Sequence, residues 1–330
     1  MENTSKIKWG IVGLGNIAKQ FASELQLIDS AELCAVASRN IEKAQDFASQ
    51  FQCPKAYGSY DELFQDENID ILYIATPHDS HAELTIKALE NNKNVLCEKP
   101  LALHYSDVEQ MIAAAKKSNK FFMEAFWTRF NPSIRETLEH IQNGSIGEVK
   151  YVSADFSIKF ENPDNTRMTD MKLGGGALMD IGVYPLFLAY LILGKPKEIV
   201  AKSNFYSTGA DTQTSIILQY ENAQAVLHCS FLYTCNVEAT ISGTKGRINL
   251  DPLWFMTESY SLTHGTLVEG EQKSKFERPT LGKGYTYEIE ECHACLRADK
   301  TESELWSHQN SLELAAIVEA VKNQIGLMYS

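Results

Sequence analysis

The sequence predicts an α/β protein with two domains, the first built on a doubly wound parallel sheet and the second on a large, open, mainly antiparallel sheet. Apolar strands alternate with amphipathic helices through the first 125 residues, which is the pattern of a parallel sheet. Beyond residue 125, extended segments joined by tight turns replace this alternation. A chain of 330 residues also exceeds the size of most single cores. We therefore expect one domain over residues 1–125 and a second α/β domain over residues 126–330.

The first domain opens with an apolar strand at residues 6–12, followed by a helix in which Ile17, Phe21 and Leu25 recur every fourth position. A second strand at residues 31–38 completes a βαβ unit. The alternation continues with helices expected at 41–51, 61–65, 81–91 and 106–118, and strands at 69–75, 94–98 and 120–125.

The second domain is predicted from alternating extended segments, with hairpin turns at residues 219–223 and 242–246. The loops at 159–172 and 259–284 have no pattern that predicts their path. Strands are expected at 149–160, 198–206, 212–220, 223–234, 237–242 and 247–250, and helices at 132–143, 177–193, 285–296 and 307–325.

Charge and composition exclude several classes of protein. The net charge of −13 repels polyanions, so nucleic acid is not an expected partner. No apolar run approaches the roughly 18 to 20 residues that span a bilayer, and the N-terminus leads straight into a strand. We therefore expect a cytoplasmic protein with no membrane partner. The seven cysteines are an odd number at scattered positions, which predicts reduced thiols.

The segment from Cys292 to Cys295, which includes His293, resembles half of a zinc site or a redox motif. It lies in a predicted helix, and the sequence contains no second pair of ligands. We interpret the two cysteines as small side chains on adjacent helical turns and expect no metal site.

The turn from Gly13 to Ala18 has the spacing of the dinucleotide-binding fingerprint of Rossmann domains. In that fingerprint, the glycine at the position of Gly13 makes the tight turn, and the one at Gly15 lets the backbone approach a pyrophosphate. Because the motif lies between a predicted strand and a predicted helix, we expect Gly13, Gly15, Asn16 and Ile17 to bind a nicotinamide cofactor.

The end of the second strand predicts which cofactor is used. Sheets specific for NAD carry Asp or Glu at this position, whereas this chain has Ser38 and then Arg39. A hydroxyl and a guanidinium suit a 2′-phosphate, and Lys43 adds a positive charge one helical turn later. The sequence therefore predicts NADP, with NAD as the alternative cofactor.

Two further strands end in residues that suit a ligand site. Thr76 and Pro77 follow the strand at 69–75, at the edge where open α/β sheets bind ligands. His78 and His81 come next, and we assign His81 to the cofactor pocket, although a packing role is equally compatible with the sequence.

The strand at 94–98 ends in Glu98 and Lys99, and a lysine there can bind a substrate oxygen or stabilise an alkoxide. A glycine run at residues 174–176 leads into a predicted helix on which Asp180 and Tyr184 stand four residues apart, and therefore on one face. Tyrosine, with a pKa near 10, transfers protons readily only beside a cation, and Lys99 is the candidate for that cation.

Together these motifs resemble the glucose–fructose oxidoreductase, inositol dehydrogenase and rhizopine-catabolism (Gfo/Idh/MocA) family of NAD(P)-dependent oxidoreductases, over essentially the whole chain. Within this family the sequence is most similar to the branch of dimeric dihydrodiol dehydrogenases and NADP-dependent D-xylose 1-dehydrogenases. Many members have histidine where this chain has Tyr184. The matching segments are residues 54–60, 95–100, 123–130, 174–184 and 242–246.

The resemblance implies hydride transfer between NADP and a secondary alcohol of a sugar or a cyclic trans-diol. It implies that Tyr184 exchanges the hydroxyl proton, assisted by Lys99, while Asp180 orients the substrate. Glu98, Trp127 and Arg129 would line the cofactor cleft between the domains, although a core tryptophan and a structural arginine fit the sequence equally well. The resemblance also implies a homodimer formed through the outer face of the second sheet.

Two other functions stay open at this point. The chain could be a non-catalytic regulator that binds the cofactor, but Lys99 and Tyr184 and the lack of a DNA-binding segment argue against this. It could also be an NAD-dependent glycosidase of the same family, which returns the hydride and produces no net reduced cofactor.

Overall fold

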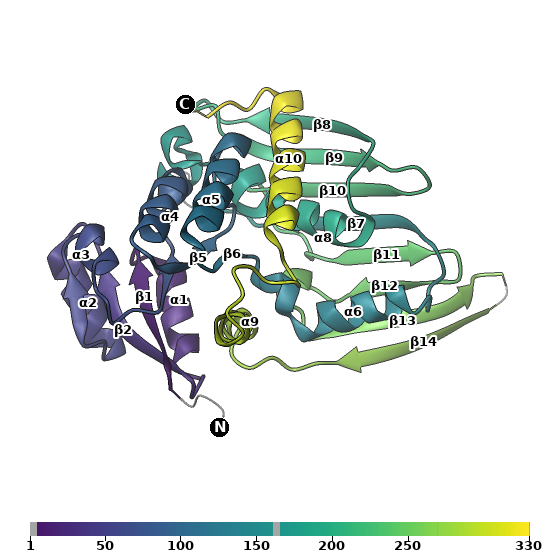
Figure 1. Ribbon diagram of the computed structural model, residues 1–330. Coiled ribbons are helices and arrows are strands. Elements are labelled where there is room, and N and C mark those ends of the chain that lie inside the picture. The colour runs from purple at the N-terminus through teal and green to yellow at the C-terminus, as the bar shows by residue number, and fades with distance from the viewer. Residues whose placement is uncertain (1–4, 161–165, 269, 330) are drawn as a thin grey trace. The chain divides into compact units, whose positions relative to one another are not determined.

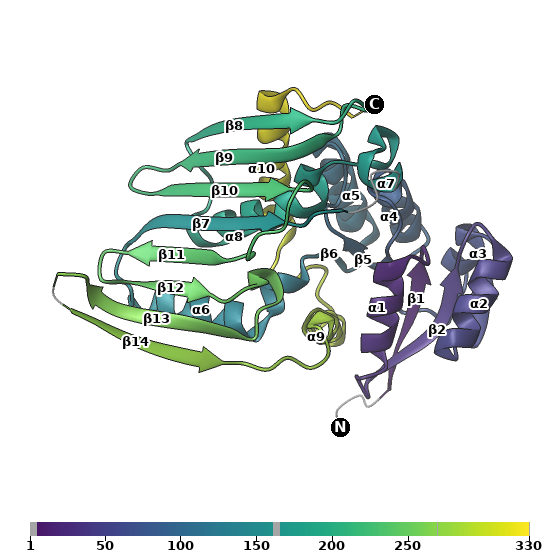
Figure 2. The same cartoon turned by 180° about the vertical axis from the view of Figure 1, so that it is seen from behind.

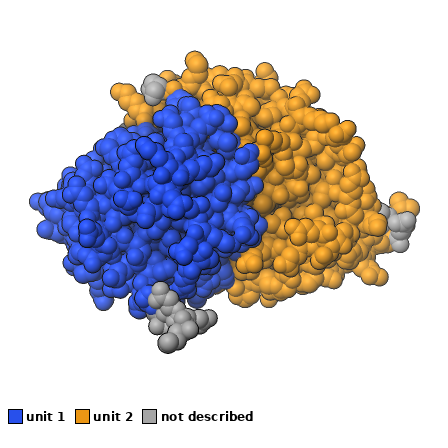
Figure 3. Space-filling view, viewed as in Figure 1, with its two compact units in different colours: residues 1–130, 281–312 blue, residues 131–280, 313–330 orange. Residues whose placement is uncertain are grey.

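The computed structural model describes residues 5–160, 166–268 and 270–329, which fold into two compact units. Unit 1 comprises residues 1–130 and 281–312, and unit 2 comprises residues 131–280 and 313–330 (Figure 3). This differs from the expected division into 1–125 and 126–330, because the segment 281–312 returns to unit 1.

Unit 1 contains a six-stranded sheet in the order β3-β2-β1-β4-β5-β6, in which all neighbouring strands are parallel. Strands β1, β2, β5 and β6 of this sheet are labelled in Figure 1. The strand order reverses beside β1, which is the topology of a doubly wound Rossmann sheet and confirms the predicted fold class. The strands are β1 (Ile7–Val12), β2 (Ala31–Ala37), β3 (Lys55–Tyr57), β4 (Ile71–Ile74), β5 (Asn94–Glu98) and β6 (Phe122–Ala125).

Two helices of unit 1 begin at residues whose side chains cap them. Asn40 Oδ1 accepts a hydrogen bond from Lys43 N at 3.1 Å, and Ser59 Oγ accepts one from Glu62 N at 3.3 Å. These side chains start the second and third helices. The helices that connect the strands are α1 (Asn16–Leu25), α2 (Ile41–Phe51), α3 (Tyr60–Phe64), α4 (His81–Glu90) and α5 (Tyr105–Ser118).

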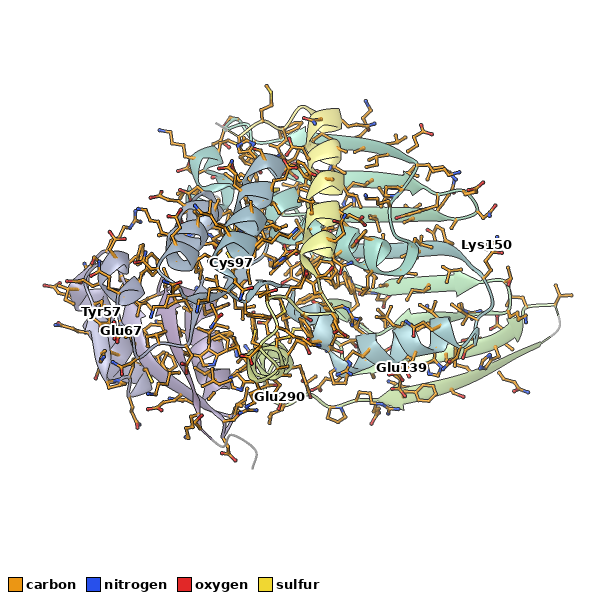
Figure 4. The ribbon with its side chains drawn as sticks, viewed as in Figure 1. Tyr57, Glu67, Cys97, Glu139, Lys150 and Glu290 are labelled. Atoms are coloured by element: carbon orange, nitrogen blue, oxygen red, sulfur yellow. The ribbon has the colours of Figure 1, made fainter. Side chains whose placement is uncertain are left out.

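The short strand β3 was not predicted, because three residues are too few to show a period. Its last residue is Tyr57, labelled in Figure 4, whose hydroxyl donates to Asp66 Oδ2 at 2.9 Å. The same carboxylate oxygen pairs with Lys55 Nζ at 2.8 Å. One carboxylate thus holds both ends of this edge strand.

A helix from late in the chain completes unit 1. Helix α9 (Tyr285–Arg297) begins against α1, where Glu24 Oε2 accepts hydrogen bonds from Tyr285 N at 2.8 Å and Thr286 N at 3.3 Å. Further along α9, His293 Nε2 accepts from Trp9 Nε1 at 3.0 Å. These contacts explain why residues 281–312 group with the N-terminal segment.

Unit 2 is built on an eight-stranded sheet in the order β14-β13-β12-β11-β7-β10-β9-β8 (Figure 2). Its neighbouring strands are antiparallel except β7 and β10, which are parallel. The strands are β7 (Val149–Ser157), β8 (Glu198–Phe205), β9 (Asp211–Gln219), β10 (Gln224–Ser230), β11 (Ala239–Gly243), β12 (Gly246–Leu250), β13 (Ser259–Thr266) and β14 (Gly270–Glu277).

The hairpin of β13 and β14 occupies much of the segment 259–284, whose path the sequence did not predict. Strand β14 reads GEQKSKFE, and seven of its eight residues are exposed. Such an edge strand has no buried face and therefore shows no apolar alternation.

Figures 1 and 2 show α6 (Pro132–Gln142), α8 (Val183–Leu193) and α10 (His308–Ile325) over one face of this sheet. Helix α10 starts within unit 1 and continues into unit 2. Among the helices described, none covers the opposite face of the sheet in these views.

One helical stretch, Met171–Leu193, is long and apolar enough to cross a membrane by length and composition alone. The expectation that no apolar run approaches such a length is therefore corrected. Because 78% of its apolar window is buried inside the protein, this stretch has the character of the core helix of unit 2.

Candidate functional site

Four parallel strands of unit 1 end at one edge of its sheet, and each is followed by a residue that the sequence assigned to the site. Gly13 follows β1, Ser38 follows β2, Thr76 lies two residues after β4, and Lys99 follows β5. Because the strands are adjacent in the order β2-β1-β4-β5, the fold gathers these four residues along the carboxyl edge. This is the edge at which open α/β sheets bind ligands.

The glycine turn after β1 leaves space for a ligand. Gly13 has a φ of +86°, and a Cβ added to it would lie 2.6 Å from Thr76 Cγ2. A Cβ added to Gly15 would meet no atom within 4 Å. Gly15 is also the N-cap residue of α1, and it has no side chain that could accept hydrogen bonds from the first backbone N–H groups of the helix. Asn16 and Ile17, which follow it, are exposed. This arrangement fits a pyrophosphate at the helix N-terminus.

Ser38 is buried, and its Oγ accepts a hydrogen bond from Asn40 N at 3.2 Å. Arg39 is exposed and lies beside the Tyr60 hydroxyl, where burial raises the pKa of Tyr60 and the guanidinium opposes that shift. Lys43 is exposed on the first turn of α2. The cationic side chains therefore stay accessible near the end of β2.

Arg39 lines a groove of about 310 Å³ on unit 1. The groove joins the end of β2 to the end of β4, and its charged and hydroxyl side chains suit a phosphorylated nucleoside. Ser59 and Tyr60 were not predicted to line this site, although both lie in the segment 54–60 that resembles the family. The groove is lined by Arg39, Gly58, Ser59, Tyr60, Asp61, Thr76, Pro77, Ser80, Glu83, Leu84 and Lys87.

The structure favours the alternative interpretation of His81, as a packing residue. His81 is 0% exposed, and its ring nitrogens lie 2.9 Å from the Thr76 carbonyl oxygen and 3.0 Å from the Pro100 carbonyl oxygen. Both nitrogens are therefore occupied by backbone. His81 ties the loop after β4 to the loop after β5, so its role in this site is to hold Thr76 and the residue next to Lys99 in place.

Two buried carboxyl groups, those of Glu98 and Glu124, accept hydrogen bonds from the backbone at Lys99 and Leu101. The Tyr73 hydroxyl donates to Glu98 Oε1, and Lys99 N donates to Glu98 Oε2 at 3.3 Å. Burial raises the pKa of Glu124 to about 7, although Ser311, Trp306 and the backbone of Leu101 donate hydrogen bonds to it. Glu98 is 8% exposed, whereas Lys99 is half-buried. Lys99 is thus an accessible lysine on a strongly fixed backbone.

Trp127 and Arg129 have structural partners inside unit 1. The Trp127 ring stacks on Tyr285 with centroids 4.6 Å apart and an interplanar angle of 5°. Arg129 Nε donates to the Leu305 carbonyl oxygen at 2.8 Å. These contacts favour the alternative interpretation of both residues, as a core aromatic and a structural arginine.

In unit 2 the glycine run leads into a π-helix, Leu178–Gly182, which is followed by α8. The predicted single α-helix over 177–193 is therefore wrong in its first turn, and the α-helical spacing of Asp180 and Tyr184 does not apply across it. Asp180 Oδ1 lies 3.5 Å from an Arg167 side-chain nitrogen. Single π turns occur often at functional sites, which makes this segment a candidate.

Tyr184 is 6% exposed and lies among aromatic rings of unit 2. Its centroid is 5.4 Å from that of Phe156 and 5.2 Å from that of Phe255, and those two rings stack at 4.4 Å. Tyr184 and Asp180 belong to unit 2, whereas Lys99 and the glycine turn belong to unit 1. The structure thus gathers the expected residues as two separate groups.

The segment from Cys292 to Cys295 packs inside unit 1. His293 accepts from Trp9 and its Nδ1 lies 3.0 Å from Ser30 Oγ, and burial lowers its pKa to about 4. All seven cysteines are free thiols. Within residues 5–160, 166–268 and 270–329, no group of three or more His, Cys, Asp or Glu side chains could hold a metal ion.

Comparison with family models places known domains on both parts of the chain. Residues 7–126 match the model described as an oxidoreductase family with an NAD-binding Rossmann fold. Residues 134–249 match the GFO/IDH/MocA C-terminal domain.

Full-length relatives and solved structures agree with these matches. The chain is 36% identical to the trans-1,2-dihydrobenzene-1,2-diol dehydrogenase of Xenopus tropicalis, covering 98% of this chain and 99% of the relative. It is 34% identical to the human enzyme of the same name, covering 98% of both. A 3-ketoreductase from Actinomadura kijaniata, solved with NADP and TDP-benzene, superimposes with a TM-score of 0.87 at 25% identity over 97% of this chain and 98% of the other.

Proposed function

This chain belongs to the Gfo/Idh/MocA family of NAD(P)-dependent oxidoreductases, and we propose that it transfers hydride between NADP and a secondary alcohol of a sugar or a cyclic trans-diol. The observation that carries the proposal is the carboxyl edge of the unit 1 sheet. There the open glycine turn, the accessible Arg39 and the lysine after β5 follow adjacent strands.

The choice of NADP rests on Ser38 and Arg39. No carboxylate follows β2, so nothing at that position repels a 2′-phosphate. The Arg39 guanidinium and the Ser38 hydroxyl can donate to its oxygens, and Lys43 adds charge from the first turn of α2. The solved ketoreductase with NADP supports the same choice.

For the reaction, the bound nicotinamide supplies the hydride acceptor or donor. We propose that Tyr184 accepts the proton of the substrate hydroxyl and returns it in the reverse direction. The Lys99 ammonium stabilises the tyrosinate form of Tyr184 that accepts this proton, and also the substrate oxygen that loses it, while Asp180 orients the substrate through its other hydroxyl groups. Because Tyr184 lies among aromatic rings in unit 2, a nearby cation is the group that would make it effective as a base.

The substrate class is supported by the relatives. The Xenopus and human relatives are named for a cyclic trans-diol, trans-1,2-dihydrobenzene-1,2-diol. Oxidation of such a diol and oxidation of a pyranose hydroxyl both remove hydride from a ring carbon that carries a hydroxyl group. In both substrates, a neighbouring ring carbon also carries a hydroxyl group. Both are therefore substrates that this site would treat alike.

The proposal is tested by turnover measurements with trans-1,2-dihydrobenzene-1,2-diol and D-xylose, following the absorbance of reduced cofactor with NADP and with NAD. General acid–base catalysis contributes about 10²- to 10⁴-fold in rate, so Tyr184→Phe should lower kcat by that factor with little change in NADP affinity. Lys99→Met should cause a similar or larger loss. The double variant should be little worse than the more damaging single one, since groups that act together are not additive.

Tyr220→Phe is the matched control, because Tyr220 is buried in unit 2 and its hydroxyl has no hydrogen-bond partner among the described residues. It should keep wild-type kcat. A Tyr184→Phe variant that retains most of its activity would exclude Tyr184 as the proton carrier. Tightly held cofactor with no net reduction would point to the glycosidase of the same family.

We also propose that the protein is a cytoplasmic homodimer formed through the open face of the unit 2 sheet. On β8, β9 and β10, Val200 lies opposite Ile217 and Ile217 opposite Val226. Their exposures are 44%, 43% and 41%. A row of exposed apolar side chains on three adjacent strands supports a protein partner on this face.

A further inference from the structure

A buried carboxyl group lies against the glycine run of unit 2. Asp211 is the first residue of β9 and is 0% exposed. Its Oδ2 accepts hydrogen bonds from Leu178 N at 2.9 Å and from Thr214 Oγ1 at 2.8 Å. Its Oδ1 is buried without a hydrogen-bond partner in the part of the chain that the structure describes. A carboxyl group so far from water must be held there by what it binds.

The glycine run is shaped to admit this carboxyl group. Gly176 has a φ of +128°, which L side chains rarely adopt, and a Cβ added to it would collide with Asp211 Oδ1. Any other residue at this position would therefore displace the carboxyl group from Leu178.

The run is also fixed from its other sides. Gly175 N donates to the Asp170 carbonyl oxygen at 2.9 Å, and the Gly175 carbonyl oxygen accepts from the Tyr329 hydroxyl at 2.9 Å. A Cβ added to Gly175 would lie 2.8 Å from Asp170 N. The backbone before the π-helix thus contacts three other parts of unit 2, at Asp170, Asp211 and Tyr329.

Leu178 is the first residue of the π-helix, so its N–H is one of the groups that a helix leaves without an internal partner. A carboxylate at that point satisfies the N–H and interacts favourably with the helix dipole. The turn that it caps contains Asp180, and Tyr184 follows as the second residue of α8.

We propose that Asp211 is a positioning residue, which fixes the first turn of the helix carrying Asp180 and Tyr184 by accepting the hydrogen bond from Leu178 N. The proposal rests on the proposed function, in which Tyr184 handles the proton. Asp211 itself contacts neither substrate nor cofactor in this role. Its effect on the reaction is exerted through the direction of the helix.

The test compares Asp211→Ala, which removes the acceptor, with Asp211→Asn, which keeps an oxygen at the same distance from the backbone. The control is Thr263→Val, since Thr263 is a buried residue of the same sheet whose hydroxyl has no partner among the described residues. Hydrogen exchange of the amides at 176–184 is measured by mass spectrometry. Turnover and KM for trans-1,2-dihydrobenzene-1,2-diol and the Kd for NADP are measured on the same samples.

Asp211→Ala should raise the exchange rate at Leu178 by about 10-fold or more and lower kcat by a similar factor, with the Kd for NADP unchanged. Asp211→Asn should restore most of both, and it also keeps the test valid if Asp211→Ala does not fold. Thr263→Val should change neither quantity.

Two results would overturn the proposal. The first is loss of protection at Leu178 without loss of kcat, and the second is an Asp211→Asn variant as impaired as Asp211→Ala. The exchange measurement needs no substrate, so it can succeed even if the proposed function fails. That failure would be seen separately, as a Tyr184→Phe variant with nearly full activity.

Discussion

Gly13 and Thr76 contact each other so closely that no side chain fits between them. A Cβ on Gly13 would lie 2.6 Å from Thr76 Cγ2 and 2.9 Å from Thr76 N, and the residue has a φ of +86°. Two residues later, Gly15 has extended backbone and free space where its Cβ would be. The two glycines of one motif therefore differ: the fold itself requires glycine at position 13, whereas position 15 has room for a side chain unless a ligand occupies that space.

Replacing Gly15 should accordingly remove cofactor binding without unfolding the protein. Gly15→Val places two methyl groups where the pyrophosphate would approach the N-terminus of α1, while no protein atom lies within 4 Å of the added Cβ. Calorimetry should detect no NADP binding, and thermal unfolding should stay cooperative and close to wild type. Gly13→Ala is the matched comparison and should lower the melting temperature. Unchanged NADP affinity in Gly15→Val would reduce the motif to a structural turn.

Cofactor preference should depend on Arg39. Removing one charge-assisted contact to phosphate costs about 1.5 to 3 kcal/mol, so Arg39→Ala should weaken NADP binding about 10- to 150-fold and leave NAD binding nearly unchanged. Titrations with both cofactors measure this, with Arg135→Ala as a control because Arg135 is an exposed arginine on α6 of unit 2. A wild-type protein that uses NAD and NADP equally well would contradict the assignment.

A buried acid in unit 1 should make stability depend on pH. Glu288 is 0% exposed, neither of its carboxyl oxygens has a hydrogen-bond partner among the described residues, and burial raises its pKa well above the usual value. The folded state therefore holds this proton more tightly than the unfolded state. The resulting stabilisation is complete below the pKa of the unfolded chain and is lost as pH rises toward the folded pKa, at about 1.4 kcal/mol per pH unit.

Glu288→Met should remove this pH dependence and raise the free energy of unfolding. The increase should be larger at pH 8 than at pH 5. Glu290→Met is the control, because Glu290 is exposed on the same helix (labelled in Figure 4). Burial also raises the pKa of Asp211 to about 6 and that of Glu124 to about 7. Both groups therefore add to the pH dependence of stability, but they are present in both variants, so the comparison with Glu290→Met cancels their contributions. Denaturant titrations at several pH values measure the difference. A Glu288→Met variant with the pH dependence of the wild type would show that Glu288 is ionised or hydrated in the folded state.

Dimer formation should be sensitive to Ile217, the central residue of the exposed apolar row on β8, β9 and β10. Ile217→Asp would bury a charge in the proposed interface, which is costly without a partner, so sedimentation should detect a monomer. Leu27→Asp replaces an equally apolar residue of unit 1, exposed by 48%, and should leave the mass unchanged. A dimer that survives Ile217→Asp would place the interface elsewhere.

Five of the six strands of the parallel sheet were predictable because they are largely buried on both faces, and the helices α2 and α3 begin at the capping residues Asn40 and Ser59. Strand β14 was not predictable, since its exposed, charged residues carry no periodic signal. The return of α9 to unit 1 depends on contacts such as Trp9 with His293, which join distant parts of the chain and leave no local pattern.

The candidate site divides in the same way. Gly13, Ser38, Thr76 and Lys99 were predictable from their position after strands, because adjacent parallel strands end at one edge. The packing role of His81 could not be told from a role in the pocket, since its sequence position near that edge does not tell whether its ring faces outward or bonds to the backbone carbonyls. Asp211 was missed because a single aspartate at a strand start has no signature. Only the fold brings it to Leu178.

The return of α9 to unit 1 sets an order for folding during synthesis. Glu24 and Trp9 are made early, but their partners Tyr285 and His293 leave the ribosome only after unit 2's entire sheet has been translated. Until then the nascent cofactor-binding half lacks the helix that covers α1, and Glu24 has no backbone N–H groups of α9 to bind. Unit 1 is therefore begun first during synthesis, but it can be completed only after the sheet of unit 2 has been translated.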